Sequence, residues 1–560
     1  MRPMTRSTTH FPSRVDRREA LCIFAVACVV YLIFRSRFYI GDGVRYLQAA
    51  LGASLPGDGG NSHFLWPFVL WIAVRGFSAL GMVPAGDGLA NLDVVALLQA
   101  VNAVAAALGL ALLYLWLRRV ASRRAALIAV ALTGLSHAFI LHATDMTEPM
   151  AAVPPVMLGL GLLGAAPDRT WARLGAGALI GLGGNFYQIA LFAAVPAVWL
   201  AATPNGPGGI AQRLLRLARA GLEIGGASVV TFVGLIVVVR FAATPGADLI
   251  HQVAQVRTVA TAGGLAGSFS PKHFAAWIFG FANAFAVLPP NEGIGRLLHS
   301  PPRDLLKALT ILALAMAFLV GLIARLVRSR QILIQRNLGP EIQAAAAWFF
   351  LVVFMVCVWS VLYEKFWLFA MLPLSMVVAL AIDPEGEPEP AAPTPVDAGA
   401  RRRLLFVAPA VALVVWNFFG AVIPRRFAAN PDVRGAVLLA GRLQATDLLV
   451  CPGWDAVSVY TRTFFRHPAE SFSITDEAVA HGPEVADRLS AAVAAAEARG
   501  GHVYMLVLPG MSRDDWDLFY GSRLKVPFTV LDPYRPAALP IEVLPAAIPE
   551  PLYELMSLRR

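Results

Sequence analysis

Carboxylates at the ends of apolar segments are the residues of this chain whose type and position could support catalysis. Asp42 follows the first apolar segment and lies between Gly41 and Gly43, which have no side chain to keep a ligand away. Such a carboxylate could act as a general base and accept the proton of an attacking hydroxyl group. The local alternative is that Asp42 is only the N-cap of a helix over 44–51.

A second polar group lies in the short sequence ILHATDMTEPMAAVPP, which separates two apolar segments. Its acidic residues, Asp145 and Glu148, are predicted to face the same cavity as Asp42 and to complete a set of catalytic carboxylates. The local alternative is that both acids only cap the helix that begins at Pro149. The three carboxylates could also bind a divalent cation, although their spacing matches no metal-binding motif.

Basic residues in the outer loops suit the phosphate group of a lipid. Arg257 and Lys272 lie in one long loop and Lys365 in the tight turn YEKFW; lipid headgroup contacts or loop salt bridges are the local alternatives. Other polar residues at the same boundary are predicted to line the cavity: Arg45, His63, His142, Gln188, His273 and Glu364. For His63 the alternative is an ordinary hydrogen-bonding residue of the interface.

The composition indicates that these residues belong to a polytopic membrane protein. Hydrophobic residues make up 57% of the 560 residues and charged residues only 15%, whereas soluble proteins carry about 25% charge. This excludes a disordered chain, a coiled coil, collagen and an ordinary soluble enzyme. The net charge of +10 does not indicate nucleic acid binding, because the basic residues stand in short runs beside apolar segments. The four cysteines form no disulfide framework or zinc motif.

Apolar length and the positive-inside rule together predict the topology. The basic run LRRVASRR ends the second span and places that end in the cytoplasm, as the basic N-terminus does for the first. Eleven spans that alternate in direction follow: 21–34, 94–117, 125–141, 150–165, 172–184, 189–202, 224–242, 305–327, 344–363, 367–382 and 404–423. The C-terminus is then outside the cytoplasm.

Two long outer loops, 35–93 and 243–304, follow from this topology. Each contains an apolar stretch, 64–80 and 274–288, that cannot span without reversing every later helix, so 64–80 is predicted to lie along the outer surface. The chain divides into a cytoplasmic basic tail over 1–18, a membrane domain over 19–423 and an outer domain over 424–560.

The outer domain is predicted to be a small α/β domain with parallel strands. Its expected strands are 447–453, 471–476, 502–510 and 528–533, and its expected helices are 455–465 and 484–499. The loop 451–455 at a strand end could hold a ligand, but no GxGxxG or P-loop motif is present. An accessory or acceptor-docking module is favoured over a second active site.

Missing motifs narrow the function further. The chain contains no HExxH, GxSxG, Walker or CxxC motif, which disfavours zinc proteases, serine hydrolases and ATP-driven pumps. It also has no row of charged residues within its spans, as most transporters and channels need. Any chemistry is therefore expected at the outer interface.

In these features the chain resembles the GT-C superfamily of integral membrane glycosyltransferases, which includes protein O-mannosyltransferases and lipid A aminoarabinose transferases. The similar segments cover roughly 19–423: GDGVRYLQAA, HFLWPFVLWIAVRGFSALG, LLQAVNAVAAALGLALLYLWLRR, SHAFILHATDMTEPMAAVPPVML and EKFWLFAMLPL. Many members carry an Asp-Glu pair in the first outer loop. Here Gly43 follows Asp42, so the second acid would have to be Asp145 or Glu148.

The resemblance is compatible with the fold expected from the sequence, a polytopic all-α membrane domain with about eleven transmembrane helices and outer interfacial helices, followed by a small C-terminal α/β domain. It implies a hexosyl- or pentosyltransferase of the bacterial inner membrane that moves a monosaccharide from a polyprenyl phosphate to a lipid, glycan or protein acceptor in the periplasm. Asp42 would be the general base, and a basic residue among Arg257, Lys272 and Lys365 would hold the leaving phosphate. The alternatives are a non-catalytic flippase or scaffold for envelope polymers, and a transferase of oligosaccharides or phospho-groups.

Overall fold

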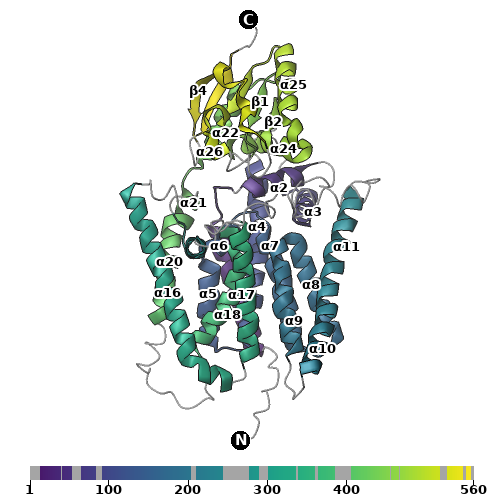
Figure 1. Cartoon of the computed structure of the whole chain (residues 1–560), viewed down its shortest axis with the longest axis vertical. Helices are drawn as coiled ribbons and strands as arrows, with labels where there is room; N and C mark the ends of the chain where they lie inside the picture. The colour runs from purple at the N-terminus through teal and green to yellow at the C-terminus, as the bar shows by residue number, and fades with distance from the viewer. Residues whose placement is uncertain are drawn as a thin grey trace.

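The computed structural model shows a bundle of helices with a small sheet-containing domain at one end (Figure 1). It describes residues 13–39, 41–52, 65–83, 91–203, 210–243, 276–288, 301–335, 338–359, 364–384, 405–453, 456–465, 467–516, 526–545 and 550–556. The helices of the bundle are α1 (Arg14–Ile33), α4 (Asn91–Leu117), α5 (Arg123–Leu135), α6 (His137–Ala143), α7 (Pro149–Ala165), α8 (Thr170–Phe186), α9 (Ala194–Ala202), α10 (Ile210–Ala220), α11 (Gly226–Ala243), α14 (Trp277–Phe285), α16 (Pro302–Gln335), α17 (Gly339–Trp359), α18 (Glu364–Ile382), α20 (Ala408–Asn417) and α21 (Ile423–Phe427).

Several of these helices are long and apolar enough to cross a membrane. Among the described residues there are six, or up to seven if the bent pair α5 and α6 forms one span. A helical segment coincides with each of the eleven predicted spans, but the count of eleven is not confirmed. Some of the segments, such as α7, are shorter than a full span, and α1 carries charged residues in its first half.

Helix α18 lies in the interior of the bundle and positions part of the site. Its residues are apolar on all sides, as expected for a buried helix, and most of its side chains are buried against neighbours that include α5, α6 and α17. Its first two residues, Glu364 and Lys365, are its only charged ones. The N-terminal end of α18 therefore places one acidic and one basic side chain inside the bundle.

The break between α5 and α6 brings a second element to the same place. The two helices meet at 65°. Ser136 between them has an extended backbone, with φ −62° and ψ 152°, so the helix cannot continue through it. Its hydroxyl group donates a hydrogen bond to the Thr133 carbonyl oxygen at 2.7 Å. The bend gives α6 its own direction and leads into the turn before α7, which the helix labels of Figure 1 show beneath the sheet-containing domain.

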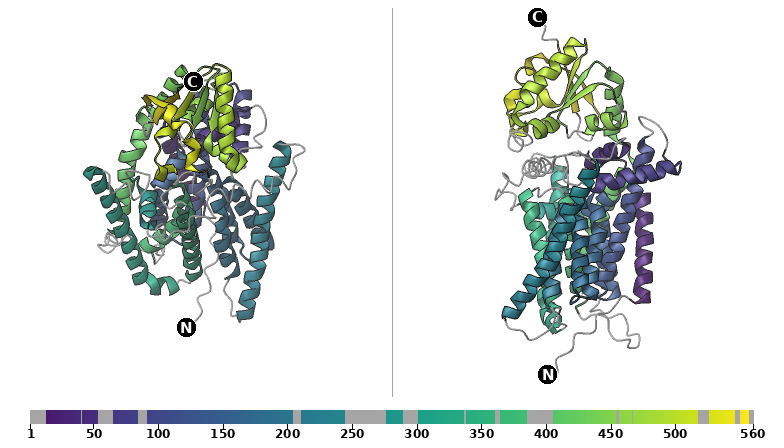
Figure 2. Two further views of the ribbon diagram at one scale, coloured as in Figure 1. Left: turned by 45° about the horizontal axis from the view of Figure 1, so that its top comes forward. Right: turned by 90° about the vertical axis from the view of Figure 1, so that its right-hand side faces the viewer.

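Two further helices, α2 (Gly41–Leu51) and α3 (Leu65–Ala79), lie across the end of the bundle that faces this domain (Figure 2). For α3 this is the orientation predicted for the apolar stretch 64–80. Helix α14, at nine residues, is too short to cross a bilayer, in agreement with the prediction that 274–288 does not span. Residues 280–285 of α14 are buried within the bundle, so α14 is an internal helix and not a surface helix.

The C-terminal domain contains a five-stranded sheet in the order β2-β1-β3-β5-β4. Its strands are β1 (Leu448–Cys451), β2 (Glu470–Ser473), β3 (Val503–Leu506), β4 (Ala538–Leu544) and β5 (Glu550–Leu555), and its helices of eight or more residues are α22 (Pro431–Arg442), α23 (Ala456–Phe464), α24 (Ile474–His481) and α25 (Val485–Ala498). The first three strands are parallel, as predicted, whereas β5 is antiparallel to both β3 and β4.

One predicted strand is wrong, and two strands were not predicted. Residues 528–533 were expected to form a strand but contain a 3-10 helix, Phe528–Leu531, because a short apolar run does not by itself distinguish the two. Strand β4 contains Pro540, which argues against a strand in a sequence. The sheet tolerates it because β4 is an edge strand and needs hydrogen bonds on one side only.

The C-terminal domain shares a hydrophobic cluster with the outer helices of the membrane domain. Helix α23 packs on α2, and the Tyr460 hydroxyl group donates a hydrogen bond to the Tyr39 carbonyl oxygen at 2.6 Å. The buried members include Val44, Tyr46, Leu47, Trp66, Leu70, Met146, Ala436, Val459, Tyr460 and Phe464. Because this core joins both parts, the domain is docked on α2 rather than merely tethered to the bundle.

The predicted topology can be tested with single cysteines at exposed positions in a cysteine-free background. We expect a membrane-impermeant maleimide to label Arg499→Cys, directly after α25, in intact bacterial spheroplasts, because the C-terminal domain is predicted to be outside the cytoplasm. Arg124→Cys, at the other end of the bundle, should be labelled only after permeabilisation. Both native side chains are exposed, so access is not limited by burial. Labelling of Arg124→Cys in intact spheroplasts would reject the orientation.

Candidate functional site

The turn between α6 and α7 contains a buried polar group. His142, Asp145, Thr147 and Glu148 are each at most 1% exposed. Asn102 of α4 holds this turn in place: its Nδ2 donates hydrogen bonds to the carbonyl oxygens of His142, at 2.6 Å, and of Asp145, at 2.8 Å. A polar residue within an apolar helix thus satisfies the backbone of a turn that contains few backbone hydrogen bonds of its own.

The two acids of this turn have different local roles. An oxygen of the Asp145 carboxylate accepts a hydrogen bond from the Met146 backbone N–H at 2.8 Å. Glu148 occupies the N-cap position of α7, with Pro149 following, as the capping alternative expected. Its side chain makes no cap hydrogen bond, however, so capping does not account for the buried Glu148 carboxylate.

Helix α18 provides the partners of this polar group. Lys365 Nζ lies 3.5 Å from Glu148 Oε1, and both side chains are largely or fully buried. His142 Nε2 lies 3.8 Å from Glu364 Oε1, and its Nδ1 is hydrogen-bonded to the Thr147 hydroxyl group at 2.7 Å. Buried charges are costly unless they are paired, so these contacts hold α18 against the turn.

Tyr187, the residue before Gln188, contacts the helix that carries Glu364 and Lys365. The Tyr187 ring stacks on Phe366, the residue after Lys365, with ring centroids 6.4 Å apart and an interplanar angle of 11°. Gln188 is half-buried at the start of the 3-10 helix Gln188–Ala193. The structure therefore brings together five of the predicted site residues at this turn, His142, Asp145, Glu148, Glu364 and Lys365, and Gln188 follows a residue that contacts α18.

Helix α2 places Asp42 close to the same turn. The helix begins at Gly41, so Asp42 lies within its first turn and not at the position before the helix, as the N-cap alternative required. At the next residue, Gly43, an added Cβ atom would lie 3.0 Å from Met146 Cγ and 3.6 Å from Thr147 Cγ2. A residue with a Cβ atom here would require the Met146 side chain to shift by a few tenths of an ångström, so this close approach favours glycine.

The charge of Asp145 acts on the contact between the two domains. Burial raises the pKa of the Tyr39 hydroxyl group to about 12, and the Asp145 charge adds to this rise. Burial likewise raises the pKa of Tyr460 well above its ordinary value, with contributions from Asp432 and Asp145. Both phenols therefore stay protonated at neutral pH. The charge of Asp145, in the turn, thus reaches the two tyrosines at the contact between the domains.

Arg45, predicted to line the cavity, contacts the C-terminal domain. Its Nη2 donates hydrogen bonds to the Gly453 carbonyl oxygen at 2.5 Å and to Asp476 Oδ1 at 3.2 Å. Gly453 follows β1 and has a φ of 98°, a conformation that favours glycine. Arg45 therefore reaches the end of a parallel strand, where α/β domains commonly bind a ligand and where the sequence placed a candidate ligand loop.

Several predicted residues lie outside the described part of the chain: His63, Arg257, Lys272 and His273. The side chain of Asp42 is likewise not described. Sequence reasoning missed Asn102, although a polar residue inside an apolar segment is a signal that could have drawn attention to it. Among the described side chains, no three of His, Cys, Asp or Glu are grouped so as to hold a metal ion.

Comparison with known proteins shows the fold. No protein-family model matches the chain, and no curated protein matches it in sequence. The chain is similar to the crystal structure of the Archaeoglobus fulgidus oligosaccharyltransferase in the apo form, with a TM-score of 0.52 and 13% identity over 92% of this chain and 72% of that chain. The complex of that protein with Zn and sulfate gives 0.51 and 13% over 91% and 71%.

A further crystal structure, of ArnT from Cupriavidus metallidurans bound to undecaprenyl phosphate, covers 97% of this chain and 98% of that chain at 14% identity. Its TM-score is 0.43, which does not by itself indicate a shared fold. The likeness shows that the chain shares the fold of that oligosaccharyltransferase, an integral membrane enzyme of the class that the sequence segments resemble. At 13% identity this likeness concerns the fold and not the substrate.

The role of Asn102 in holding the turn can be tested by replacing it with leucine. We expect Asn102→Leu to lower the free energy of unfolding by about 1–3 kcal/mol, because two buried carbonyl oxygens lose their donor. Asn417→Leu is the matched control, since Asn417 is fully buried and its side-chain amide has no hydrogen-bond partner among the described residues. Thermal unfolding in detergent measures both. Equal loss in the two variants, or none in Asn102→Leu, would contradict the assignment.

Proposed function

We propose that the chain is a glycosyltransferase that moves a monosaccharide from a polyprenyl-phosphate donor to a cell-envelope acceptor on the periplasmic face of a bacterial inner membrane. The observation that carries this proposal is the contact of Glu148 with Lys365, and of His142 with Glu364, beneath α2. The GT-C fold, which the chain shares with an oligosaccharyltransferase, supports the same class of reaction.

The position of the cluster suits a lipid-linked donor. The acids and bases lie at one end of a bundle of apolar helices, under two helices that cross that end (Figure 2). A donor with a long polyprenyl chain keeps that chain in the bilayer and presents its phosphate and sugar at this boundary. A nucleotide-linked donor would not need such a position, and the chain has no nucleotide-binding motif.

The proposed reaction is a single displacement at the anomeric carbon. An acceptor hydroxyl oxygen forms a bond to this carbon while the bond from the carbon to the phosphate oxygen breaks. The electron pair of the broken bond goes to the phosphate, and the proton of the hydroxyl group goes to the general base. Asp42 is proposed as that base, and Asp145 and Glu148 are proposed to orient the reacting groups.

Lys365 is proposed to stabilise the phosphate as negative charge develops on it. An ammonium group has three N–H donors and can contact a carboxylate and a phosphate oxygen at the same time. Arg257 and Lys272 remain proposed partners of the same phosphate. His63, His142, Gln188, His273 and Glu364 are proposed to line the substrate cavity.

The C-terminal domain is proposed to position α2 and to offer a surface to the acceptor. Arg45 and Tyr460 connect this domain with α2 and with the segment that precedes it. Arg45 is therefore proposed as a positioning residue and not as part of the cavity. Because Arg45 already contacts the loop after β1, this loop is proposed to hold the C-terminal domain on α2 and not to form a second active site.

The role of Asp42 is tested by Asp42→Asn, which keeps the shape of the side chain but cannot accept a proton. We expect transfer of a labelled sugar from polyprenyl phosphate to fall about 100-fold or more in membranes holding equal amounts of folded protein. Asp93→Asn is the matched control, because Asp93 is an exposed carboxylate in the first turn of α4. A flippase or scaffold would show no sugar transfer in the parent either. If the parent transfers sugar and Asp42→Asn keeps this activity within about threefold, Asp42 is not part of the mechanism.

The phosphate contact is tested by alanine variants of Arg257, Lys272 and Lys365. We expect at least one to weaken donor binding by about 1.5–3 kcal/mol, the value of a charge-assisted hydrogen bond. For Lys365 the double variant Lys365→Met with Glu148→Gln separates two effects. It removes the buried pair without leaving one charge unpaired, so the fold should persist while donor binding stays weak. Full donor binding in all three alanine variants would place the phosphate elsewhere.

A further inference from the structure

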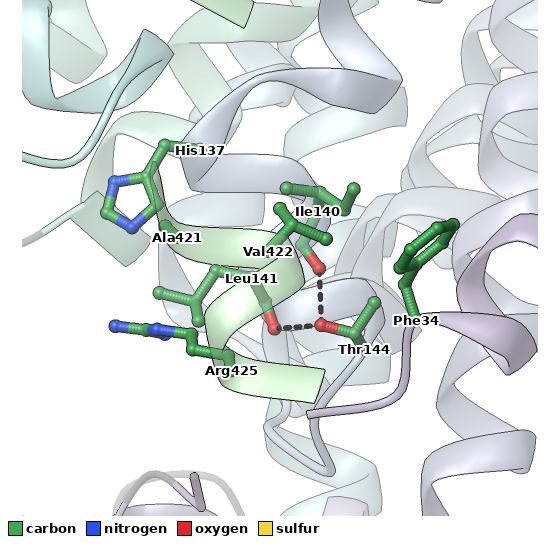
Figure 3. A pocket seen from close by; sticks show the side chains of 8 residues that line it. All are labelled: Phe34, His137, Ile140, Leu141, Thr144, Ala421, Val422 and Arg425. Carbon is green, nitrogen blue, oxygen red and sulfur yellow. Dashed lines mark hydrogen bonds between the residues drawn. The ribbon is translucent and has the colours of Figure 1, made fainter. Parts of the chain in front are cut away.

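A pocket near the candidate site has room for about one water molecule and for no larger ligand. It is lined by His137 of α6 and Arg425 of α21, together with mostly apolar side chains (Figure 3). The charge of Arg425 also acts on Glu364 of the buried cluster. The opposite end of the bundle, in contrast, presents an open basic surface.

This surface includes α10, a short helix with two contrasting faces. The helix precedes α11, packs on α9 and lies at the end of the bundle far from the C-terminal domain (Figure 1). Its sequence, IAQRLLRLARA, contains three arginines and no acidic residue. At about 3.6 residues per turn, Arg213, Arg216 and Arg219 follow one face of the helix, whereas Ile210 and Leu214 lie on the other.

The apolar face of α10 is turned away from the protein. Ile210 is 79% exposed, Leu214 60% and Leu215 71%. Exposed apolar side chains continue along the same helical segment, at Leu222 and Val230. Large apolar side chains that face outward from a membrane protein mark the surface that lipid covers. Their continuation from α11 into α10 indicates that both helices contact the same bilayer.

The length of this segment places α10 at the level of the lipid headgroups. Helices α10 and α11 are joined by the π-helical turn Gly221–Gly225, so the chain is helical from Ile210 to Ala243 without a break. Such a segment is about 50 Å long, whereas the hydrocarbon core of a bilayer is about 30 Å thick. The turn and α11 are long enough to span that core by themselves. The arginines of α10 therefore lie beyond it.

The junction between α10 and α11 is fixed to α8 by an ion-pair network. Glu223, within the π-helical turn, lies 2.9 Å from Arg219 Nε of α10 and 3.1 Å from Arg173 Nη1 of α8. Arg219 Nη2 also donates a hydrogen bond to the Thr170 hydroxyl group at 3.1 Å. These contacts hold α10 in one position. Three arginines against one glutamate leave α10 and the turn with a net positive charge.

We propose that α10 binds the headgroups of anionic phospholipids in the leaflet on its side of the membrane, which is the predicted cytoplasmic leaflet. The apolar face lies among the acyl chains, and Arg213 and Arg216 contact the headgroup phosphates. A guanidinium group offers two parallel N–H donors to one phosphate.

Charge complementarity favours an anionic lipid over a zwitterionic one, because only the anionic lipid neutralises the net positive charge of α10. An acidic soluble protein is disfavoured as the partner, since the apolar face of α10 continues the lipid-facing side of α11. Binding of these lipids goes beyond the proposed sugar transfer and does not depend on it.

The test identifies the lipid next to α10 by fluorescence quenching. A fluorescent label is attached to Leu214→Cys in the full-length, otherwise cysteine-free protein. The protein is placed in nanodiscs with equal amounts of phosphatidylglycerol and phosphatidylcholine, and the acyl chains of one of the two lipids are brominated. We expect brominated phosphatidylglycerol to quench the label at least about threefold more than brominated phosphatidylcholine. At Val230→Cys, an exposed position on α11 away from these arginines, the two lipids should quench equally.

Charge variants connect this preference with the arginines. Arg213→Gln together with Arg216→Gln should abolish the preference for phosphatidylglycerol, whereas lysine at both positions keeps the charge and should retain most of it. Arg328→Gln together with Arg330→Gln is the matched control. Both of these side chains are exposed near the end of α16, so the control loses the same charge at another place and should keep the preference.

Two results overturn the proposal: equal quenching by the two lipids at Leu214→Cys with all arginines present, or an unchanged preference in the double glutamine variant. The first comparison alters no arginine, so it decides the question even if the double variant fails to fold. Weak quenching by both lipids at Leu214→Cys, with normal quenching at Val230→Cys, also overturns the proposal. It would show that α10 lies outside the bilayer and offers its apolar face to a soluble partner.

Discussion

The burial of charged groups at the outer end of the bundle is the constraint on which the rest of the site depends. Lys365 and Glu148 lie 217 residues apart in sequence, and both are almost completely buried. Neither charge would be tolerated there alone, because an unpaired buried charge costs several kcal/mol. Their contact therefore fixes the first turn of α18 against the turn before α7, and His142 and Glu364 come within 3.8 Å as part of the same arrangement.

The helices that lie across the bundle depend on this buried cluster for their support. Gly43 allows α2 to rest directly on Met146 and Thr147, and the C-terminal domain then packs on the outer side of α2. Arg45 and Tyr460 make polar contacts across this second interface. The residues around Asp42 thus lie between the membrane domain and the C-terminal domain, and contacts on both sides suit the role of general base that is proposed for Asp42.

The candidate site could be predicted in part because its residues stand out chemically from their surroundings. Glu148, Glu364 and Lys365 are ionisable residues at the ends of apolar segments. Burying such residues near a membrane costs free energy, so they often mark functional sites. Arg45 was predicted from the same pattern, but its side chain contacts the C-terminal domain. Asn102 and Arg425 were not predicted, since one lies inside a span and the other was assigned to a domain boundary.

The sequence by itself determined where most apolar helices lie, that 64–80 lies along the end of the bundle and that the last part of the chain forms an α/β domain. These features follow from local length, periodicity and charge, which each segment carries on its own. Only the tertiary structure decided which strands pair, with Pro540 tolerated because its strand is at an edge. It alone also decided that Lys365 contacts Glu148 and that His137 shares a pocket with Arg425. Such contacts join residues far apart in the chain, and they depend on how the helices pack and not on the local sequence of either partner.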